Sequence, residues 1–478
     1  MGDVAAKSGL DTKSGLVTFR AAQGLDLRGS LLRFTRHEAT FEVYIPNLVI
    51  RTSEVLEDFK VFVQDRLVYS GRAVVRDLVN AGSVLVVGVV IEDSYFDVEF
   101  FTNLSQTGQL CRQFDGFLQE WQTVWKVRSE FKVAVADIHT FLLDLRRWLD
   151  QVELGIRSSP QLDRGEQERA AIDELSPQVI PVLDDLFENF ELIAASLSED
   201  ECPVHRSYIQ RHLHPIVLCA PFAYRSYRKP LGYAGDYELV NMMLRDPQEG
   251  SSLFAKVFNV WLLQQGSAAA HRNRVDFLKE RLIEETATAA RAGRKARILN
   301  LGCGPAWEVQ DFLAQTQLSD SAQFTLMDFN DETLQHAGQA LREKQERHQR
   351  TTSISLVKKS VQQLLKDTVR TDGLGRGEKF DLVYCAGLFD YLPDHVCKRL
   401  MNVFYESLLP GGLALATNVS TSSPNRGSLQ LILDWHLCYR DAARTATLRP
   451  QGLQQEAARV LIDATGVNVF LEARKPNG

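Results

Sequence analysis

The sequence predicts an α/β protein whose mixed sheet is preceded by a helical region and an N-terminal antiparallel β-barrel. Short runs rich in β-branched and aromatic residues fill the first hundred positions. Helical periodicity follows to about residue 294, and strands then alternate with helices to the C-terminus. That alternation is typical of a parallel, doubly wound sheet. We expect four regions: a barrel at 1–105, a helical connector at 106–200, a helical cap at 201–294 and the α/β domain at 295–478.

The predicted barrel rests on short strands separated by turn residues. These strands are 31–34, 40–45, 59–63, 67–75 and 83–91. Gly, Asn, Pro and Asp interrupt the apolar runs at regular intervals, for example at Pro46-Asn47 and at 80–82. Regular turn signals between short strands indicate a small barrel or sandwich.

The middle of the chain has the spacing of amphipathic helices. Apolar residues recur every three or four positions from Phe114 to Trp125 and from Val135 to Trp148. We interpret this aromatic stripe as helix core. A second helical block is predicted at 169–197. The stretch 204–235 contains three prolines, and we expect it to be irregular and functional.

Five strands are predicted for the parallel part of the α/β sheet, with helices between them. The strands are 297–301, 324–327, 353–357, 380–385 and 412–417, and two of the helices are 331–347 and 394–408. The end of the chain, 460–471, has two apolar runs around a turn, which predicts a terminal antiparallel hairpin.

Composition and charge limit the function. The chain has 478 residues, of which 45% are hydrophobic and 24% charged, with a net charge of -7. These values exclude a disordered or fibrous protein and argue against a general nucleic-acid binder. The seven cysteines are scattered without zinc-ligand spacing, so we expect reduced thiols and no metal site. The N-terminus has no apolar signal segment and no apolar run could span a bilayer, which predicts a cytoplasmic protein without membrane insertion.

The most informative segment is Leu301-Gly302-Cys303-Gly304-Pro305, a glycine-rich turn between a strand and a predicted helix. Glycines allow close approach of the backbone to a ligand, and a helix N-terminus offers free N–H groups. Asp328 ends the next strand, 24 positions after Gly304, the spacing at which an acid reaches ribose hydroxyls. The alternative for Asp328 is to cap the following helix. Trp307 replaces the third glycine of a dinucleotide fingerprint, which argues against a dinucleotide.

The segment from about residue 297 to the C-terminus resembles class I S-adenosylmethionine-dependent methyltransferases. The glycine turn, Asp328, the strand 380–385, Leu408-Leu409-Pro410-Gly411-Gly412 and the hairpin carry this resemblance. It implies a Rossmann-like, seven-stranded sheet and S-adenosyl-L-methionine as the cofactor. Two positions differ from the family pattern: Asn300 where an acid is common, and Lys359-Ser360-Val361 where an Asp usually meets the adenine. Ser360 could still hydrogen-bond the adenine.

The resemblance implies ten cofactor contacts. They are Gly302, Cys303, Gly304, Asp328, Phe329, Ser360, Val361, Cys385, Asp236 and Arg272. Asp236 and Glu238 either bind the methionine ammonium group or cap a helix. Arg272 and Arg274 either meet the methionine carboxylate or form a solvated helix face.

A second resemblance concerns the acceptor. Lys-Pro-x-Gly-Tyr-x-Gly-Asp-Tyr-Glu at 229–238 and Leu-Asp-Trp at 433–435 resemble a methyltransferase family of 3-hydroxypalmitic acid methyl ester (extracellular factor) biosynthesis. This implies methyl transfer to a carboxylate such as that of a (hydroxy) fatty acid. A carboxylate is ionised at pH 7 and needs no strong base.

The predicted catalytic residues are Tyr233, Tyr237, Trp435 and Arg440. Arg440, Arg228 and the two tyrosines are candidates to hold the acceptor carboxylate. For Arg440 the alternative is an ion pair, and for Trp435 it is core packing. His436 could act as a base if the acceptor were a hydroxyl or an amine.

Other interpretations remain open. No Asn- or Asp-Pro-Pro-Tyr tetrapeptide follows the strand 380–385, which argues against DNA N-methylation. The chain could methylate a small-metabolite hydroxyl or amine, or be a catalytically silent cofactor-binding scaffold. The N-terminal region resembles a PilZ-like barrel, a class that often binds cyclic di-GMP. Arg33 and Arg36 are one residue too close for the usual arginine pair, and Asn103–Gly108 follows the last strand. We therefore expect the barrel to have a structural or protein-docking role rather than to bind the nucleotide.

Overall fold

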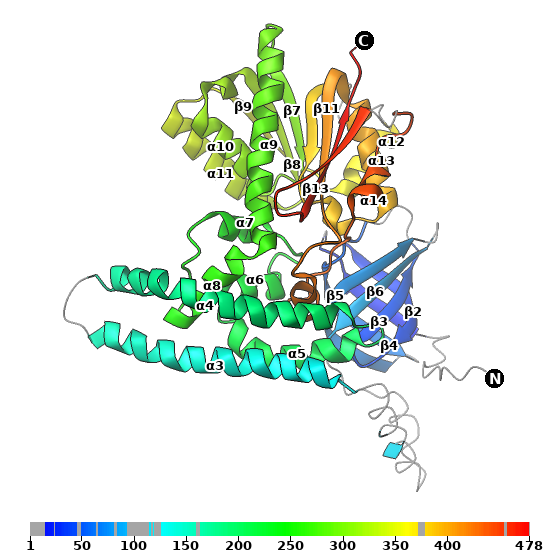
Figure 1. Ribbon diagram of the computed structural model, residues 1–478. Coiled ribbons are helices and arrows are strands. Elements are labelled where there is room, and N and C mark those ends of the chain that lie inside the picture. The colour runs from blue at the N-terminus through cyan, green and yellow to red at the C-terminus, as the bar shows by residue number, and fades with distance from the viewer. Residues whose placement is uncertain are drawn as a thin grey trace. The chain divides into compact units, whose positions relative to one another are not determined.

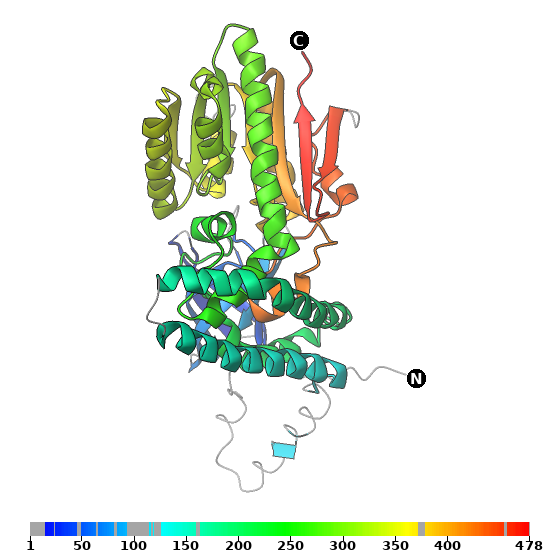
Figure 2. The ribbon, with the colours of Figure 1, turned by 60° about the vertical axis from the view of Figure 1, so that its left-hand side comes forward.

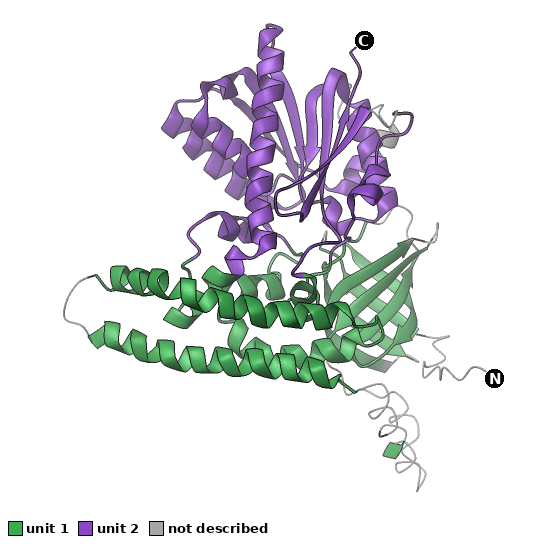
Figure 3. Cartoon of the chain, in the orientation of Figure 1, with its two compact units in different colours: residues 1–234, 248–261, 426–436 green, residues 235–247, 262–425, 437–478 purple. Residues whose placement is uncertain are grey.

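The computed structural model describes residues 15–22, 24–44, 49–63, 66–80, 84–92, 114–115, 118, 126–158, 163–370, 378–453 and 457–477. The chain divides into two compact units (Figure 3). Unit 1 comprises 1–234, 248–261 and 426–436, and unit 2 comprises 235–247, 262–425 and 437–478. This division differs from the four predicted ranges because both units are built from separate stretches of the chain.

Unit 1 contains a closed six-stranded barrel. The strands run in the order β1-β2-β3-β6-β5-β4 and all pairings are antiparallel. Their bounds are β1 (Gly15–Arg20), β2 (Asp26–Phe34), β3 (Glu38–Val43), β4 (Val55–Val63), β5 (Arg66–Asn80) and β6 (Leu85–Ile91). The predicted barrel and its five strands are confirmed. The sequence interpretation missed β1, whose buried positions are only Val17 and Phe19.

Alternation of buried and exposed residues builds the barrel interior. In β3, for example, Ala39, Phe41 and Val43 are buried and the residues between them are more exposed. Phe41 lies at the centre of an aromatic group, with its ring 5.2 Å from that of Phe19 and 5.9 Å from that of Phe59. The barrel is therefore filled by side chains.

Long helices complete unit 1. The helices α3 (Ser129–Ser158) and α4 (Arg164–Ala195) lie side by side and antiparallel (Figures 1 and 2). Phe131, near the start of α3, packs on Phe190, near the end of α4, with ring centroids 5.6 Å apart. In the predicted stripe, Val135, Ile138 and Leu142 are buried, but Trp148 is 49% exposed, so the core interpretation is wrong for this aromatic residue. Of the other predicted stripe, Phe114 is exposed, and Trp121 and Trp125 lie outside the described residues.

The expectation that 204–235 is irregular was wrong. This stretch contains most of α5 (Cys202–Val217) and all of α6 (Pro221–Arg228). Pro221 is the first residue of α6, where a backbone N–H would make no hydrogen bond within the helix. Pro215 lies in the last turn of α5. The prolines therefore mark helix ends. Unit 1 also contains most of α8 (Leu253–Gln264) and a short π-helix, η3 (Ser428–Ile432).

Unit 2 is built on a seven-stranded mixed sheet in the order β12-β13-β11-β10-β7-β8-β9. Its strands are β7 (Ala296–Leu301), β8 (Ala322–Asp328), β9 (Ser353–Lys358), β10 (Phe380–Cys385), β11 (Leu408–Val419), β12 (Ala458–Ile462) and β13 (Asn468–Arg474). Neighbouring strands from β9 to β11 are parallel, and β13 pairs antiparallel with β11 and β12. The predicted Rossmann-like sheet and terminal hairpin are confirmed.

Helices cover both faces of this sheet. On one face α9 (Gly266–Arg291), α10 (Trp307–Gln315) and α11 (Asp331–His348) pack in a row, and on the other lie α12 (Val361–Arg370) and α13 (Asp394–Glu406) (Figures 1 and 2). The remaining elements are α7 (Tyr237–Leu244), α14 (Ala442–Ala446) and the 3-10 turns η1 (Gln317–Ser321) and η2 (Phe389–Tyr391). The turns that follow β7, β8 and β10 meet at the carboxyl edge, where open α/β sheets bind ligands.

No helix within the described ranges is both long and apolar enough to cross a membrane.

Candidate active site

The glycine turn after β7 is held in place by the neighbouring strand. The backbone N–H groups of Gly302 and Cys303 both donate to Met327 O, at 2.8 and 3.0 Å. Gly302 and Gly304 have φ values of +73° and +52°, which glycine adopts without strain. A Cβ added at Gly304 would meet no atom within 4 Å, and one at Gly302 would meet only Leu388 at 3.8 Å. The backbone of the turn therefore borders open space, as the sequence predicted for a ligand-binding loop.

Asp328 joins this turn from the end of β8. Its Oδ2 accepts a hydrogen bond from Gly304 N at 3.2 Å, and its Oδ1 accepts from Asn330 N at 3.0 Å. The helix α11 is capped by Asn330, whose side chain accepts from Thr333 N at 3.0 Å. The alternative role of Asp328 as the cap is therefore filled by another residue. The Asp328 carboxylate is therefore hydrogen-bonded directly to the glycine turn.

A buried carboxylate lies directly behind the turn. Glu308, in the first turn of α10, accepts hydrogen bonds through Oε1 from Tyr384 Oη at 2.7 Å and from Asn300 Nδ2 at 3.1 Å. Burial raises the pKa of the Glu308 carboxyl, and the hydrogen bond from Tyr384 opposes that shift. Asn300 stands in the strand position where the resembled family often has an acid. Glu308 supplies a carboxylate beside that position from the adjacent helix.

Arg274 brings a buried positive charge to the same edge. It extends from α9, is 6% exposed, and packs against the turn after β10, where its Nη1 would be 3.1 Å from a Cβ added at Gly387. Its Nη2 donates to His271 Nε2. Within the described part of the chain no carboxylate forms an ion pair with Arg274. Burial lowers the pKa of this guanidinium, and the charges of Asp390 and Glu308 act in the opposite direction.

Asp390 lies in η2, immediately after the turn that follows β10. Its Oδ1 accepts a hydrogen bond from Val419 N at 2.6 Å, which ties η2 to the end of β11. The side chain is 4% exposed, and no ion pair is made to it by the residues that the structure describes. Burial raises the pKa of Asp390 to about 6, although Arg274 and Arg440 favour the charged form. A carboxyl group with this pKa changes its charge close to physiological pH.

The family model described as a methyltransferase domain matches residues 298–412. The chain therefore carries a methyltransferase domain. The matched range begins in β7 and ends in β11, so it includes the glycine turn, Asp328, Glu308 and Asp390.

The chain is also similar to several solved structures. One is a possible exported protein from Bordetella parapertussis, at 15% identity and a TM-score of 0.40, covering 67% of this chain and 99% of that one. Another is magnesium protoporphyrin IX methyltransferase from Synechocystis PCC 6803 with bound SAH, at 12% identity and a TM-score of 0.34, covering 56% and 99%. A third is the N-methyltransferase NodS from Bradyrhizobium japonicum, at 16% identity and a TM-score of 0.26, covering 42% of this chain and 98% of that one. No curated protein matches the chain.

The residues of the methyltransferase domain fit S-adenosyl-L-methionine, which supplies a methyl group on a positively charged sulfur. The open space beside Gly304 admits a ligand against the backbone. Asp328 is a carboxylate at the end of β8, bonded to this turn through Gly304 N, and a carboxylate can accept hydrogen bonds from ribose hydroxyls. Arg274 and Asp390 are buried and have no ion-pair partner among the described residues, which suits the charged end of this molecule.

All ten predicted cofactor residues lie in unit 2. Burial raises the pKa of the Cys303 and Cys385 thiols well above the usual range, so both stay protonated. Ser360 directly precedes α12 and caps it: its Oγ accepts from Gln363 N at 3.2 Å, and its N–H donates to Gln363 Oε1 at 2.9 Å. That reciprocal cap leaves the hydroxyl proton of Ser360 available, and its predicted adenine contact stays a prediction.

The structure shows local partners for the other two predicted cofactor residues. Asp236 caps α7, accepting from Glu238 N at 3.1 Å and Leu239 N at 3.0 Å. Arg272 donates through Nη1 to Met243 O at 3.1 Å and to Leu263 O at 3.0 Å. These contacts favour the capping alternative for Asp236 and a structural role for Arg272.

The predicted catalytic residues are divided between the two units. Tyr237 and Arg440 belong to unit 2, whereas Tyr233 and Trp435 belong to unit 1. Tyr237 Oη donates to Glu332 Oε1 at 2.8 Å, and its ring packs on His336. Trp435 is 6% exposed, which agrees with the core-packing alternative.

Arg440 is fully buried and holds the segment after β10. Its Nε donates to Asp394 Oδ1 at 2.8 Å, and its Nη1 donates to Phe389 O at 2.8 Å and to Asn418 Oδ1. Its Nη2 donates to Leu392 O. This geometry favours the ion-pair alternative for Arg440, with a positioning role for η2, over contact with an acceptor carboxylate.

The segment around Asp434 is anchored inside unit 1. Asp434 is fully buried and accepts from Arg206 Nε at 2.6 Å, Gln210 Nε2 at 2.8 Å and Arg72 Nη1 at 2.9 Å. These arginines hold the pKa of Asp434 well below its usual range against the effect of burial. The neighbouring His436 is buried, and burial lowers its pKa to about 3. His436 is therefore neutral at pH 7 and a weak base.

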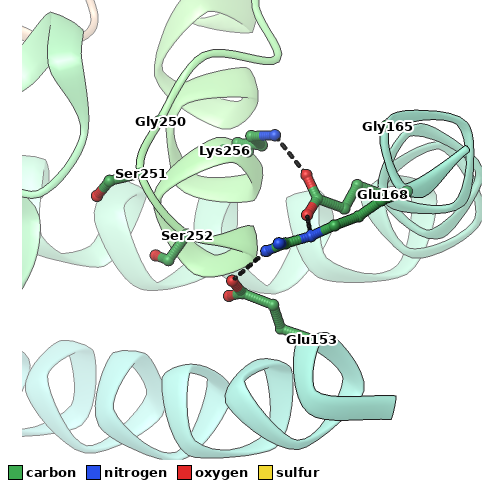
Figure 4. A pocket seen from close by; sticks show the side chains of 8 residues that line it. Glu153, Gly165, Glu168, Gly250, Ser251, Ser252 and Lys256 are labelled. Carbon is green, nitrogen blue, oxygen red and sulfur yellow. Dashed lines mark hydrogen bonds and ion pairs between the residues drawn. The ribbon is translucent and has the colours of Figure 1, made fainter. Parts of the chain in front are cut away.

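A separate pocket of about 290 Å³ lies in unit 1 among α3, α4 and the start of α8 (Figure 4). Its charged residues pair with one another. Lys256 Nζ lies 2.6 Å from Glu168 Oε2, Arg164 Nε lies 3.1 Å from Glu168 Oε1, and Glu153 accepts from Leu253 N at 3.1 Å. Because these charges are already compensated, we interpret the pocket as an ion-paired junction of three helices.

Sequence reasoning missed Glu308 and Asp390. Each is a single acid in the first turn of a short helical element. An acid at such a position is usually exposed and interacts favourably with the helix dipole, so it does not stand out as a site residue. One sequence feature could have indicated Glu308. Asn300 occupies the strand position where an acid is common, and Glu308, eight residues later, is the first acid that follows it.

Proposed function

We propose that this enzyme transfers the methyl group of S-adenosyl-L-methionine to an acceptor carboxylate, such as that of a fatty or hydroxy fatty acid. Such an acceptor is already ionised at pH 7, so the domain has to bind and orient it but does not have to deprotonate it. The proposal is carried by the histidines, which are the usual bases for a hydroxyl or amine acceptor. His271, His336 and His436 have hydrogen-bond partners or a lowered pKa.

Two of the described histidines in unit 2 have local hydrogen-bond partners. His271 Nε2 accepts from Arg274, and burial lowers the pKa of His271 well below its usual value. His336 Nε2 lies 3.0 Å from Asn241 Nδ2, whose amide group also accepts from Trp307 Nε1 at 2.7 Å. In unit 1 the pKa of His436 is about 3. An acceptor that arrives as an anion suits such a site.

A second candidate function is methylation of a hydroxyl or an amine. Asp390 favours this alternative, because it is a buried carboxyl with a pKa of about 6 at the edge where the acceptor would bind. A group with that pKa can accept a proton at neutral pH. The two candidates therefore differ in whether Asp390 takes part in proton transfer.

Product chemistry separates the candidates. The full-length protein is incubated with methyl-labelled S-adenosyl-L-methionine and a panel of fatty acids and 3-hydroxy fatty acids. We expect label in a methyl ester, which mild base releases as methanol. Label that survives mild base would show an ether or N-methyl product and favour the second candidate. Cofactor binding without turnover on any acceptor, cell extract included, would favour a silent scaffold.

We further propose a cytoplasmic enzyme whose barrel docks a protein. The six cysteines in the described ranges are free thiols, which suits a reducing compartment. Two barrel arginines that could meet an anion are engaged inside unit 1: Arg72 with Asp434 at 2.9 Å, and Arg76 with Glu38. The Asn103–Gly108 segment lies outside the described residues. Calorimetry of the full chain with cyclic di-GMP tests the nucleotide alternative, and saturable heat would overturn protein docking as the role of the barrel.

A further inference from the structure

The methyltransferase domain and the helix before it contain three buried ionisable side chains that make no ion pair among the described residues. Arg274 is 6% exposed, Glu308 6% and Asp390 4%. Each comes from a different element: α9, the first turn of α10, and η2 after β10. A buried charge without a counter-charge is costly, so a domain that keeps three of them has a reason to do so.

The three groups are close enough to act on one another. Arg274 packs against the turn after β10, only a few residues before Asp390, with Nη1 3.1 Å and Nη2 3.3 Å from the Cβ position of Gly387. The charges of Asp390 and Glu308 both favour the charged form of Arg274, although neither lies within ion-pair distance of it. The arrangement therefore has separated positive and negative sites beside one open loop.

We propose that Arg274, Glu308 and Asp390 form a receptor for the amino-acid end of the cofactor, an inference that rests on the proposed function. Arg274 receives the carboxylate, and the two acids face the ammonium and sulfonium charges. The formal charges are complementary: one cation and two anions in the protein, against one anion and two cations in the ligand. In this receptor Arg274 takes the carboxylate contact predicted for Arg272, and Glu308 takes the ammonium contact predicted for Asp236. Arg272 and Asp236 are instead bonded to local partners.

Two ligands that differ only at this end test the receptor. S-Adenosylhomocysteine carries the ammonium and carboxylate groups, and 5′-methylthioadenosine lacks both. We expect calorimetry on the full-length protein to show that S-adenosylhomocysteine binds at least about 10-fold more tightly, as for a charge-assisted hydrogen bond. Equal affinities in the unmodified protein would overturn the receptor while leaving nucleoside binding intact. Failure of both ligands to bind would overturn the proposed function itself.

The variant Arg274→Leu should abolish the preference for S-adenosylhomocysteine, and Arg274→Lys should keep part of it. The matched control is Arg281→Leu on the same helix, because Arg281 is already paired with Glu472 at 2.6 Å. Arg281→Leu should keep the full preference. If Arg274→Leu does not fold, Arg274→Lys decides, and an unchanged preference in either Arg274 variant would overturn the role of this residue.

The acids are tested with a second pair of ligands. Sinefungin carries an amine where the cofactor has its sulfonium, and S-adenosylhomocysteine has a neutral thioether there. Asp390→Asn and Glu308→Gln keep the shape of each side chain and remove its charge. At least one of them should reduce the preference for sinefungin over S-adenosylhomocysteine by about 10-fold. Unchanged preferences in both variants would overturn the assignment of the acids.

Discussion

Asp328 Oδ2 accepts a hydrogen bond from the backbone N–H of Gly304 at 3.2 Å. The acid at the end of β8 therefore fixes the turn that follows the neighbouring strand, β7. This contact places the Asp328 carboxylate beside the loop, where it has two tasks: it shapes the loop, and it is the predicted acceptor for the ribose hydroxyls. Asp328→Ala should therefore weaken binding of S-adenosylhomocysteine by about 10-fold to 100-fold, the loss expected for one or two hydrogen bonds to a charged group. Isothermal titration calorimetry measures this loss.

The control for that prediction removes a neighbouring acid that does not touch the glycine turn. Asp331→Ala removes an acid three positions away, on the first turn of α11, whose partner is the exposed Lys358. It should leave the affinity unchanged. If Asp328→Ala binds as tightly as the unmodified protein, the ribose role assigned to this residue is wrong.

Gly304→Ala should separate ligand binding from folding. The new Cβ would meet no protein atom within 4 Å, so its cost to folding is backbone strain alone, about 1 kcal/mol at the positive φ of +52°. The same Cβ would enter the space that the cofactor needs, and the affinity for S-adenosylhomocysteine should fall by more than about 10-fold.

Gly293→Ala is the matched variant. Gly293 has a φ of +73° and also has no atom within 4 Å of the added Cβ, but it lies in the turn between α9 and β7. Chemical denaturation should show similar losses of stability in both variants, while only Gly304→Ala loses affinity. Equal affinities in the two variants would contradict the placement of the cofactor beside Gly304.

The arginines that share Asp394 predict a contrast in stability. Arg440 is fully buried and also binds the main chain of η2, whereas the Arg444 side chain is 57% exposed and pairs with Asp394 at 3.0 Å. Arg440→Lys should reduce the free energy of unfolding by about 3 kcal/mol, because a lysine cannot reach the same acceptors from a buried position. Arg444→Lys should cost less than about 1 kcal/mol. Urea denaturation measures both, and equal effects would contradict the role of Arg440.

The fold of unit 2 could be predicted because its signals are local and repeated. Each buried strand is an apolar run, each helix has its own periodicity, and the glycine turn with Asp328 combines chain geometry with a fixed spacing. Local signals also predicted the closed barrel, although β1 was missed because only two of its residues face the core.

The polar part of the site could not be predicted in the same way. Arg440 and Arg274 have the same letter in the sequence, but one is bonded to main-chain carbonyls and the other lacks an ion pair among the described residues. Which acid or base lacks a partner depends on tertiary packing, and one sequence does not encode it as a spacing. For this reason the sequence alone leaves Arg272 and Arg274 as equal candidates for the methionine carboxylate and gives no signal for Asp390.

His436 predicts a pH dependence of stability in unit 1. Burial lowers its pKa to about 3, with Asp434 opposing that shift and Arg206, Lys229 and Arg76 reinforcing it. The unfolded chain therefore binds one more proton than the folded chain between about pH 6.5 and pH 3. Stability should fall as the pH is lowered through this window, by at most about 1.4 kcal/mol per pH unit from this group. His436→Leu should flatten the dependence in urea denaturation from pH 7 to pH 5, and an unchanged slope would contradict the neutral state.

Asp390 predicts a dependence of the opposite sign. Its pKa is raised to about 6 in the folded protein, in spite of Arg274 and Arg440, so the folded chain holds a proton that the unfolded chain releases near pH 4. The contribution of Asp390 to stability should therefore decrease as the pH rises from about 4 to about 6, and then stay constant. The full difference is about 3 kcal/mol, from about two pKa units at 1.36 kcal/mol each.

Asp390→Asn keeps an acceptor for Val419 N and has no charge to titrate. Without ligand, the variant should match the unmodified protein in free energy of unfolding at pH 4 and exceed it at pH 7. The gain should shrink when S-adenosyl-L-methionine is added, because the positive ligand stabilises the charged Asp390 of the unmodified protein and not the amide. Urea denaturation at the two pH values, with and without the cofactor, measures both effects. A variant that is less stable at pH 7 than the unmodified protein would show that the Asp390 charge is compensated within the fold and is not held for a ligand.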